Sequence, residues 1–480
     1  MTRTRTALLA AAGALIAGCT LGPAYERPAV ELPAAWQGAP VTGASAAADR
    51  WWTLYSDAAL DRLVGEALEH NQDLALAVAR VDEARAQARI ADSLLMPSVD
   101  AGFQRDRSRR SDVTATPFPP GTPIESNNYR AQLNVAYEVD LWGRLKSASN
   151  AARADLLATM AAQETVRNAL VTEVVRVYYT LVSLDAQIAA TSRSLALRSN
   201  GLALQRVRAR AGLINDFDLR QLEAEVAAAQ SQLPALEANR TAQEAALAVL
   251  AGRSPRSIME GAIARRDGQG EPQPPVVPDG LPSDLLLRRP DVVAAEQRLI
   301  GANARIAEAR AALFPRIALT GMLGSESAAL GDLFSGPAAI WSLAFGLAQP
   351  IFQGGRLFAE VEAVKARERQ ALAQYQKALQ DAFREVRQAL STQTRAREVF
   401  DSESARAAAL TESLRLARIR YQNGLLSQLE VLDAERNLLQ AELNRADALR
   451  AQRTAVADLV NALGGGWQGL PAAPVAQQKP

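Results

Sequence analysis

The 480-residue sequence contains a single cysteine, Cys19, and a single histidine, His70. A disulfide needs two cysteines, a structural zinc site needs about four Cys or His ligands, and a Cys–His nucleophile pair needs both residues in one site. The chain also has no large excess of charge of either sign, because 53 Lys and Arg residues are balanced by 52 Asp and Glu residues. Nucleic-acid binding normally requires a basic surface. No Gly-rich phosphate loop follows a strand. We therefore expect no enzyme activity, no metal, no cofactor and no nucleic-acid partner.

Long apolar runs are scarce as well. Residues 1–18 combine Arg3 and Arg5 with an apolar run too short to span a bilayer, which is typical of a secretory signal peptide. The run ends in Ile-Ala-Gly before Cys19 and resembles a bacterial lipobox, in which the cysteine is acylated. Thr20 follows, where an aspartate usually signals retention in the inner membrane. We expect a lipid on Cys19 and delivery to the outer membrane, anchored by acyl chains.

Repetition is what the sequence does have. GLINDFDL at 212–219 and GLLSQLEV at 424–431 share a glycine, two apolar residues and an acid six positions after the glycine. Two further pairs of landmarks recur at similar offsets, Pro97 with Pro315 and Gly143 with Gly355. Such self-similarity indicates an internal duplication.

Each repeat is predicted to contain, in order, a helix, a β-hairpin, a very long helix, a tight turn and a second long helix. The predicted division is a signal peptide at 1–18, a lipid-anchored segment at 19–50, a first repeat at 51–252, a Pro/Gly-rich linker at 253–282, a second repeat at 283–463 and an irregular tail at 464–480.

Alternating side chains mark the two hairpins, predicted at about 97–141 and 315–351. Between Tyr129 and Leu141 apolar and aromatic residues alternate with polar ones, and from Trp341 to Leu347 large apolar residues alternate with small ones. One apolar and one polar face fit a membrane β-barrel, although an amphipathic hairpin on a soluble core would give the same pattern. The smallest membrane barrels need about eight strands, so the four strands of one chain cannot close a barrel. Because lipid does not tolerate an open sheet edge, the chain should oligomerise.

The predicted helices at 145–210 and 356–422 are unusually long, about 100 Å each at 1.5 Å per residue. In the last helix alanines recur every seven residues from Ala434 to Ala462, and a second apolar series that includes Leu432 and Leu439 lies on the opposite side. Two apolar seams indicate two neighbouring helices, as in a cylinder wall. A long Ala-rich antiparallel coiled coil is the alternative.

Five stretches resemble a known family, and they cover nearly the whole mature chain in the family's order. They are CTLGPAYERP (19–28), WWTLYSDAALDRLVGEALEHNQDLALAVARVDEARA (51–86), YEVDLWGRL (137–145), LPSDLLLRRPDVVAAEQRLIGANARIAEARAALFPRIALTG (281–321) and RYQNGLLSQLEVLDAERNLL (420–439). The chain resembles the outer-membrane factors, or TolC-like efflux channels, in their lipid-anchored NodT-like subgroup.

The resemblance implies a mainly α fold with a membrane β-barrel. It implies a homotrimer that shares one 12-stranded barrel, four strands per chain, continued by a long α-helical periplasmic barrel. It also implies a periplasmic adaptor (membrane fusion) protein and an inner-membrane pump of the resistance-nodulation-division type as partners. The function would be an outer-membrane duct for small molecules such as drugs. A lipid-anchored scaffold without a pore, or the same duct in type I protein secretion, are the alternatives.

The resemblance assigns the turns at about 211–216 and 423–428 to the periplasmic tips of the helical hairpins. It implies that acids just after the tips line a narrow, cation-attracting aperture, namely Asp218, Glu430 and Asp433. Helix capping is an alternative for two of them, because Ser427 with Glu430 matches a capping box and Asn215 precedes Asp218 in a similar way.

The tip residues are expected to form a contact surface, because exposed apolar clusters usually mark contacts, and the resemblance implies that the adaptor is the partner. These residues are Gly212, Leu213, Ile214, Gly424, Leu425 and Leu426. Apolar packing within each turn is the alternative.

Overall fold

The computed structural model describes residues 21–29, 49–111, 113, 123–261, 263–265, 287–467 and 469–470. Cys19 with the predicted signal peptide, and most of the predicted linker 253–282, lie outside the described residues. The chain divides into two compact units, and each contains segments of both sequence repeats. Unit 1 comprises Met1–Ala29, Val81–Thr159 and Ala295–Tyr375, and unit 2 comprises Val30–Arg80, Met160–Ala294 and Gln376–Pro480.

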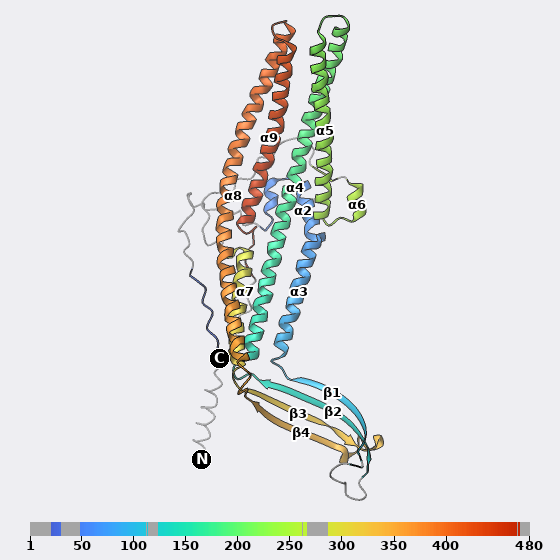
Figure 1. Ribbon diagram of the computed structural model, residues 1–480, viewed down its shortest axis with the longest axis vertical. Coiled ribbons are helices and arrows are strands. Elements are labelled where there is room, and N and C mark those ends of the chain that lie inside the picture. Colours follow the sequence, from blue (N-terminus) through green and yellow to red (C-terminus); the bar gives the residue numbers. More distant parts are fainter. Residues whose placement is uncertain are drawn as a thin grey trace. The chain divides into compact units, whose positions relative to one another are not determined.

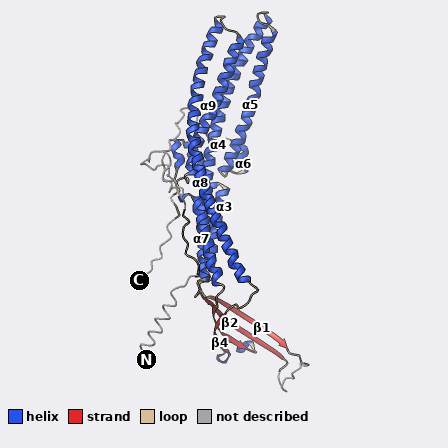
Figure 2. Cartoon of the chain, turned by 60° about the vertical axis from the view of Figure 1, so that its left-hand side comes forward, coloured by secondary structure: helices blue, strands red, loops and turns tan. Residues whose placement is uncertain are grey.

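Unit 1 contains a four-stranded antiparallel sheet in the order β1-β2-β3-β4 (Figure 2). The strands are β1 (Ser98–Arg109), β2 (Glu125–Val139), β3 (Arg316–Ser327) and β4 (Ala339–Ala348). The two hairpins predicted from the alternation are present, and they join through β2 and β3, where Tyr137 lies opposite Leu319. Within the described residues, β1 and β4 each have a partner on one side only.

The register of the sheet separates apolar side chains on one face from polar side chains on the other. Val99, Val135 and Leu343 belong to the apolar face, because residues opposite each other in the ladder share a face. The other face carries Gln132, Asn134 and other polar residues of β2. Several large apolar side chains are largely exposed in the single chain, with Trp341 at 78%. The described residues of one chain therefore leave the apolar face uncovered.

Long helices make up most of both units (Figure 1). The four longest are α4 (Arg144–Arg210), α5 (Asp216–Leu250), α8 (Arg356–Gln422) and α9 (Gln428–Ala462), and α4 and α8 match the helices predicted at 145–210 and 356–422. The shorter ones are η1 (Trp51–Tyr55), α2 (Ala58–His70), α3 (Gln72–Ser93), α6 (Pro255–Glu260), α7 (Pro290–Ala311), η3 (Leu330–Asp332) and η4 (Gly336–Ala338). No helix in the described part of the chain is both long and apolar enough to cross a membrane.

The main apolar core of unit 2 gathers aromatic residues from η1 and α4. Tyr55 and Tyr178 are fully buried, and their rings pack on Tyr179. Tyr178 donates a 2.6 Å hydrogen bond to Asp57, whose other carboxylate oxygen caps the start of α2. The guanidinium of buried Arg453 from α9 lies 5.0 Å from the ring centre of Tyr179. These contacts hold the start of α2, the middle of α4 and the last third of α9 together.

Helix α9 is buried along both of the seams that the sequence predicts. Ala441, Ala448, Ala455 and Ala462 are buried in the alanine seam, and Leu432, Leu439 and Val460 are buried in the opposite one. A helix covered on two sides has a neighbour on each, and small alanines allow one of them to approach closely. This arrangement fits a helical wall better than a helix with a single core-facing stripe.

Candidate functional site

The two glycine turns of unit 2 have the same backbone geometry. Gly212 and Gly424 each adopt a φ of +71°, which glycine tolerates without strain. In each turn the N–H of the residue after the glycine donates a 2.9 Å hydrogen bond to a carbonyl of the preceding helix. These bonds run from Leu213 to Arg208 and from Leu425 to Arg420. The repeated sequence therefore encodes a repeated turn. Both turns lie at the same end of unit 2 (Figure 1).

The three predicted aperture acids lie in the first two turns of the helices that follow these glycines. Asp218 is in the first turn of α5, Glu430 is in the first turn of α9, and Asp433 lies deeper in α9. All three are exposed. Within the described residues, no hydrogen bond or ion pair joins one of these acids to another. A single chain thus presents the three acids without assembling them into a ring.

Helix capping accounts for the position of Glu430. Its carboxylate accepts 2.9 Å and 2.8 Å hydrogen bonds from the backbone N–H and hydroxyl of Ser427, and Ser427 Oγ in turn accepts the N–H of Glu430. These bonds, the backbone one first, lower the pKa of Glu430. The capping box predicted from sequence is therefore present. At the other turn, Asn215 accepts the N–H of Asp218 at 2.8 Å.

Asp433 has different partners. It is bonded to Arg436, and Asn437 donates to it at 3.1 Å, both on the next turn of α9. It lies beyond the first helical turn, so capping does not explain an acid at this position.

Apolar side chains surround the two turns. Leu213 and Leu425 are 73% and 69% exposed, as expected for a contact surface, whereas Ile214 and Leu426 are half-buried. Phe217 and Leu429 were not among the predicted tip residues, yet both are exposed in the first turn of α5 and of α9. An apolar residue five positions after each tip glycine was the signal in the sequence.

The first hairpin is tied to the second a short distance from the tips. Tyr421, near the end of α8, accepts hydrogen bonds from Gln205 Nε2 at 2.9 Å and from Arg208 Nη1 at 3.0 Å. Gln205 Nε2 also lies 3.2 Å from Gln428 Oε1 at the start of α9. An apolar cluster adjoins these bonds and contains Leu202, Leu222, Val226 and Leu432. The sequence reading assigned no role to Tyr421, although it is three residues before Gly424.

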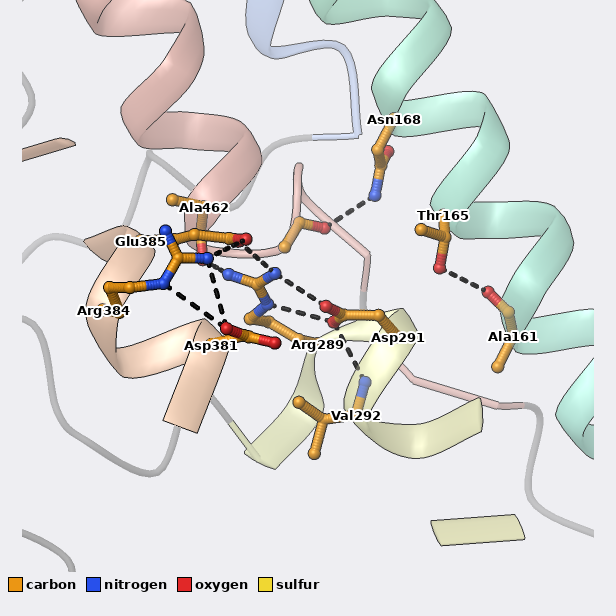
Figure 3. Close-up of polar contacts among 11 residues, drawn as sticks. Ala161, Thr165, Asn168, Arg289, Asp291, Val292, Asp381, Arg384, Glu385 and Ala462 are labelled. Atoms are coloured by element: carbon orange, nitrogen blue, oxygen red, sulfur yellow. Dashed lines mark hydrogen bonds and ion pairs between the residues drawn. The ribbon is translucent and has the colours of Figure 1, made fainter. Parts of the chain in front are cut away.

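At the far end of α9, Arg289 forms a second junction (Figure 3). It donates to the carbonyl of Ala462 at 2.7 Å, to both oxygens of Asp291 and to Glu385 at 2.8 Å. Ala462 ends α9, where carbonyl groups lack helical partners, so a guanidinium is favourable there. One buried side chain thereby holds the end of α9, the start of α7 and the middle of α8 together. Only its place in LRRPDV, just before a Pro-initiated helix, hinted at this role.

In unit 1 the described N-terminal segment 21–29 is bound along α7. Arg27 pairs with the buried carboxylate of Glu296 through two 2.6 Å bonds, and Tyr25 donates to it at 3.2 Å. Burial, and then the charge of Glu296, raise the pKa of Tyr25. Two side chains of α7 also bind carbonyls of the segment, Asn303 with Pro23 at 3.0 Å and Arg310 with Leu21 at 3.2 Å. The described part of the chain is thus bound to α7 from Leu21 onward, two residues after Cys19.

The sequence profile "Outer membrane efflux protein" matches residues 63–253 and 281–465. The chain belongs to this family. It is 37% identical over 460 residues to "Outer membrane protein OprJ" of Pseudomonas aeruginosa, covering 94% of each chain. It is 32% identical over 461 residues to "Cation efflux system protein CusC" of Escherichia coli O157:H7, covering 94% of this chain and 97% of the relative. Among solved structures, the Campylobacter jejuni CmeC outer membrane channel superposes with a TM-score of 0.86 at 25% identity over 94% of this chain.

Membership of the family confirms the fold class and the location expected from the sequence. The protein is an outer-membrane efflux channel, in which the four-stranded sheet contributes to the β-barrel and the long helices to the helical barrel. The relatives are channel and transport proteins. In the described part of the chain, no group of three or more His, Cys, Asp or Glu side chains is arranged to hold a metal ion.

Proposed function

We propose that the chain forms a homotrimeric duct that passes small molecules from an adaptor and an inner-membrane pump to the exterior. The observation that carries the proposal is the pair of identical glycine turns at one end of unit 2, each followed by an acid at the same position, Asp218 and Glu430. Three chains would place three copies of each acid, together with Asp433, around the narrow end of the duct. Acids crowded in this way attract cations.

Trimerisation is supported by the sheet. Among the described residues, nothing covers its apolar face, and its edge strands β1 and β4 each pair on one side only. Lipid does not tolerate open edges. Pairing β1 of one chain with β4 of the next would close twelve strands, a size within the range of membrane barrels.

The adaptor is proposed to bind the tips. Leu213, Leu425, Phe217 and Leu429 present exposed apolar surface on both hairpins, and such surface on a water-facing helix end favours a protein partner. A pump of the resistance-nodulation-division type is proposed as the third component. The relatives include a cation efflux system protein and the outer membrane protein of a toluene efflux pump, so small molecules are proposed without a narrower class.

Lipid attachment at Cys19 is part of the proposal. The bound segment 21–29 supports it, because a chain fixed along α7 would hold an acylated N-terminus at a defined place. The chain itself is proposed to need no cofactor beyond that lipid.

Conductance in planar bilayers tests the aperture. The wild type is compared with the triple variant Asp218→Ala, Glu430→Ala, Asp433→Ala. A control variant, Glu398→Ala, Glu403→Ala, Glu412→Ala, removes the same charge from exposed ion pairs elsewhere on α8. We expect small cation-selective currents that grow and lose selectivity in the aperture variant and change little in the control.

Two results would contradict the proposal. Equal currents from the aperture variant and the wild type would remove the three acids from the conduction path. No current from any folded protein would favour the lipid-anchored scaffold. Export of small molecules by a reconstituted pump, without secretion of a protein, would separate efflux from type I secretion.

A further inference from the structure

The two helical hairpins of unit 2 are equivalent in structure as well as in sequence. Corresponding residues of the two repeats are 212 positions apart, as the numbers of the two tip glycines show. Arg206 of α4 forms a 3.0 Å ion pair with Glu223 of α5. The residues 212 positions later, Arg418 of α8 and Glu435 of α9, form the same pair at 2.9 Å. Helix α8 therefore corresponds to α4, and α9 corresponds to α5.

The surroundings of the two hairpins differ. Figure 1 shows α8, α9, α4 and α5 of unit 2 in a row, so that α9 has a long helix on each side and α5 lies at the end. Three polar pairs join α4 to α9, namely Arg176 with Asp458 at 2.6 Å, Gln187 with Asp447 at 3.2 Å and Arg193 with Glu442 at 3.5 Å. Gln187 lies eleven residues after Arg176, and Asp447 lies eleven residues before Asp458. The two helices thus keep one antiparallel register.

Helix α5 has an exposed flank at the positions that correspond to this part of α9. Ala235 corresponds to Asp447, and Ala246 corresponds to Asp458. The exposed residues along the flank are small and uncharged, namely Ala228, Ser231, Ala235, Ala238, Ala242 and Ala246. The other side of α5 is buried, at Leu222, Val226 and Leu247. Small side chains allow a second helix to approach the flank closely.

Helix α8 presents the corresponding flank at the other end of the row. Its Val399 corresponds to Gln187 of α4, and the apolar side chain is 52% exposed in the single chain. Within the chain Gln187 donates to Asp447. The counterparts of that pair are Val399 and Ala235. Both members have changed from polar to apolar, as expected if these two positions meet and exclude water.

We propose that α5 of each chain docks against α8 of the next chain, in the antiparallel register that joins α9 to α4 within one chain. The inference rests on the proposed homotrimer and adds which surfaces meet and how they align. The two surfaces are different and each chain supplies one of each, so the contacts run head to tail and close a ring. The junction between chains then repeats the junction within a chain, with apolar contacts in place of polar pairs.

One pair of positions makes the register testable. Within the chain, Asp447 Oδ1 lies 3.5 Å from Ser183 Oγ. The counterparts are Ala235 and Arg395, so the register places these two residues side by side across the junction between chains. A disulfide forms only when the two Cα atoms are within about 7 Å. It therefore reports both the partner and the alignment.

The experiment uses three pairs of cysteines in the full-length protein. The inter-chain pair is Ala235→Cys with Arg395→Cys, and the reference pair within a chain is Ser183→Cys with Asp447→Cys. The register control combines Ala235→Cys with Ser402→Cys, which moves the second cysteine by about 10.5 Å along the same face of α8. Unheated gels establish the native oligomer of each protein before mild oxidation. The wild type, which has Cys19 alone, gives the background.

We expect the inter-chain pair to give covalent trimers on heated, non-reducing gels, and reduction should return them to monomers. The yield should exceed that of the register control about tenfold, because the displaced cysteine lies beyond the reach of a disulfide. The reference pair should lose its free thiols and remain monomeric, since its disulfide lies within one chain.

Three results would overturn the proposal. In a native trimer, an inter-chain pair that stays monomeric while the reference pair reacts would leave the flank of α5 to another partner, and the homotrimer would stand. Equal yields from the inter-chain pair and the register control would refute the alignment. Monomers on unheated gels would refute the homotrimer together with this inference.

Discussion

Tyr421 of the second hairpin accepts a 2.9 Å hydrogen bond from Gln205 of the first, near the end of both long helices. Arg208 donates to the same hydroxyl at 3.0 Å. The tyrosine oxygen is therefore a shared acceptor that links the two hairpins just behind the tips. Separation of the hairpins would require breaking both bonds.

Replacement of Tyr421 by Phe should favour the open channel. The change removes the acceptor of two hydrogen bonds, each of about 1 kcal/mol, while the ring remains. The two bonds together amount to about 2 kcal/mol, so we expect an increase in open probability of up to roughly thirtyfold in planar bilayers. The control is Thr411→Val on the same helix, because Thr411 bonds only within α8. Unchanged gating in Tyr421→Phe would show that the two bonds do not hold the closed state.

Ser427→Ala should shift the acid side of the channel's pH profile. In the wild type the bonds from Ser427 favour the charged carboxylate and lower the pKa of Glu430. Because the pKa of the folded state is lowered, the stabilisation of the helix end by the cap is fully present at pH values above the ordinary pKa of glutamate. This stabilisation is lost as the pH falls through the lowered pKa. Without the hydroxyl, cation selectivity should disappear at a higher pH during acidification. Ser427→Thr retains the hydroxyl and should behave like the wild type, and coinciding profiles for all three would exclude this effect.

Arg289→Ala should destabilise the helical part strongly. The side chain is 8% exposed, and its removal takes one donor from Asp291, from Glu385 and from a helix-end carbonyl, which typically costs about 1.5–3 kcal/mol for lost hydrogen bonds to charged groups. Arg384→Ala is the matched control, since Arg384 shares the carboxylate of Glu385 but is 60% exposed (Figure 3) and should cost less than about 1 kcal/mol. The rate of loss of the native oligomer on heating measures both. Similar rates for the two variants would refute the role of Arg289.

Glu296→Gln should release the segment 21–29 from α7. The change weakens the paired bonds to Arg27 and removes the charge that holds the Arg27 guanidinium in place. Chymotrypsin should then cleave after Tyr25 several-fold faster, about the factor expected for the loss of one charge-assisted bond. Glu308→Gln on the same helix is the control, because Glu308 faces Arg144 and Arg305 instead. Equal cleavage rates would mean that Glu296 does not hold the segment.

The sequence went far toward the fold because the elements are long and strongly periodic. Alternation over many residues identified both hairpins, and the near absence of glycine and proline identified two helices of 67 residues each. The seven-residue spacing of alanines in α9 likewise anticipated burial on two sides. Local patterns of this kind survive in the fold because side-chain period and backbone geometry are directly linked.

The site was predictable only where its signals were local. The glycine turns and the capping box of Ser427 with Glu430 depend on neighbouring residues, and both were predicted. The partners of Tyr421 lie more than two hundred residues away along the chain. No spacing within one segment indicates such a pair.

By itself, then, the sequence determined the repeated turns, the two faces of the sheet and the membership of an outer-membrane family, because each depends on short-range periodicity or on contiguous motifs. Tertiary structure alone decided that Arg289 joins three helices, that Glu296 holds the N-terminal segment, and that Gln205 meets Tyr421. Those contacts arise because folding brings together segments that are far apart in the sequence, and a polar group buried there must find its partner wherever the packing places one.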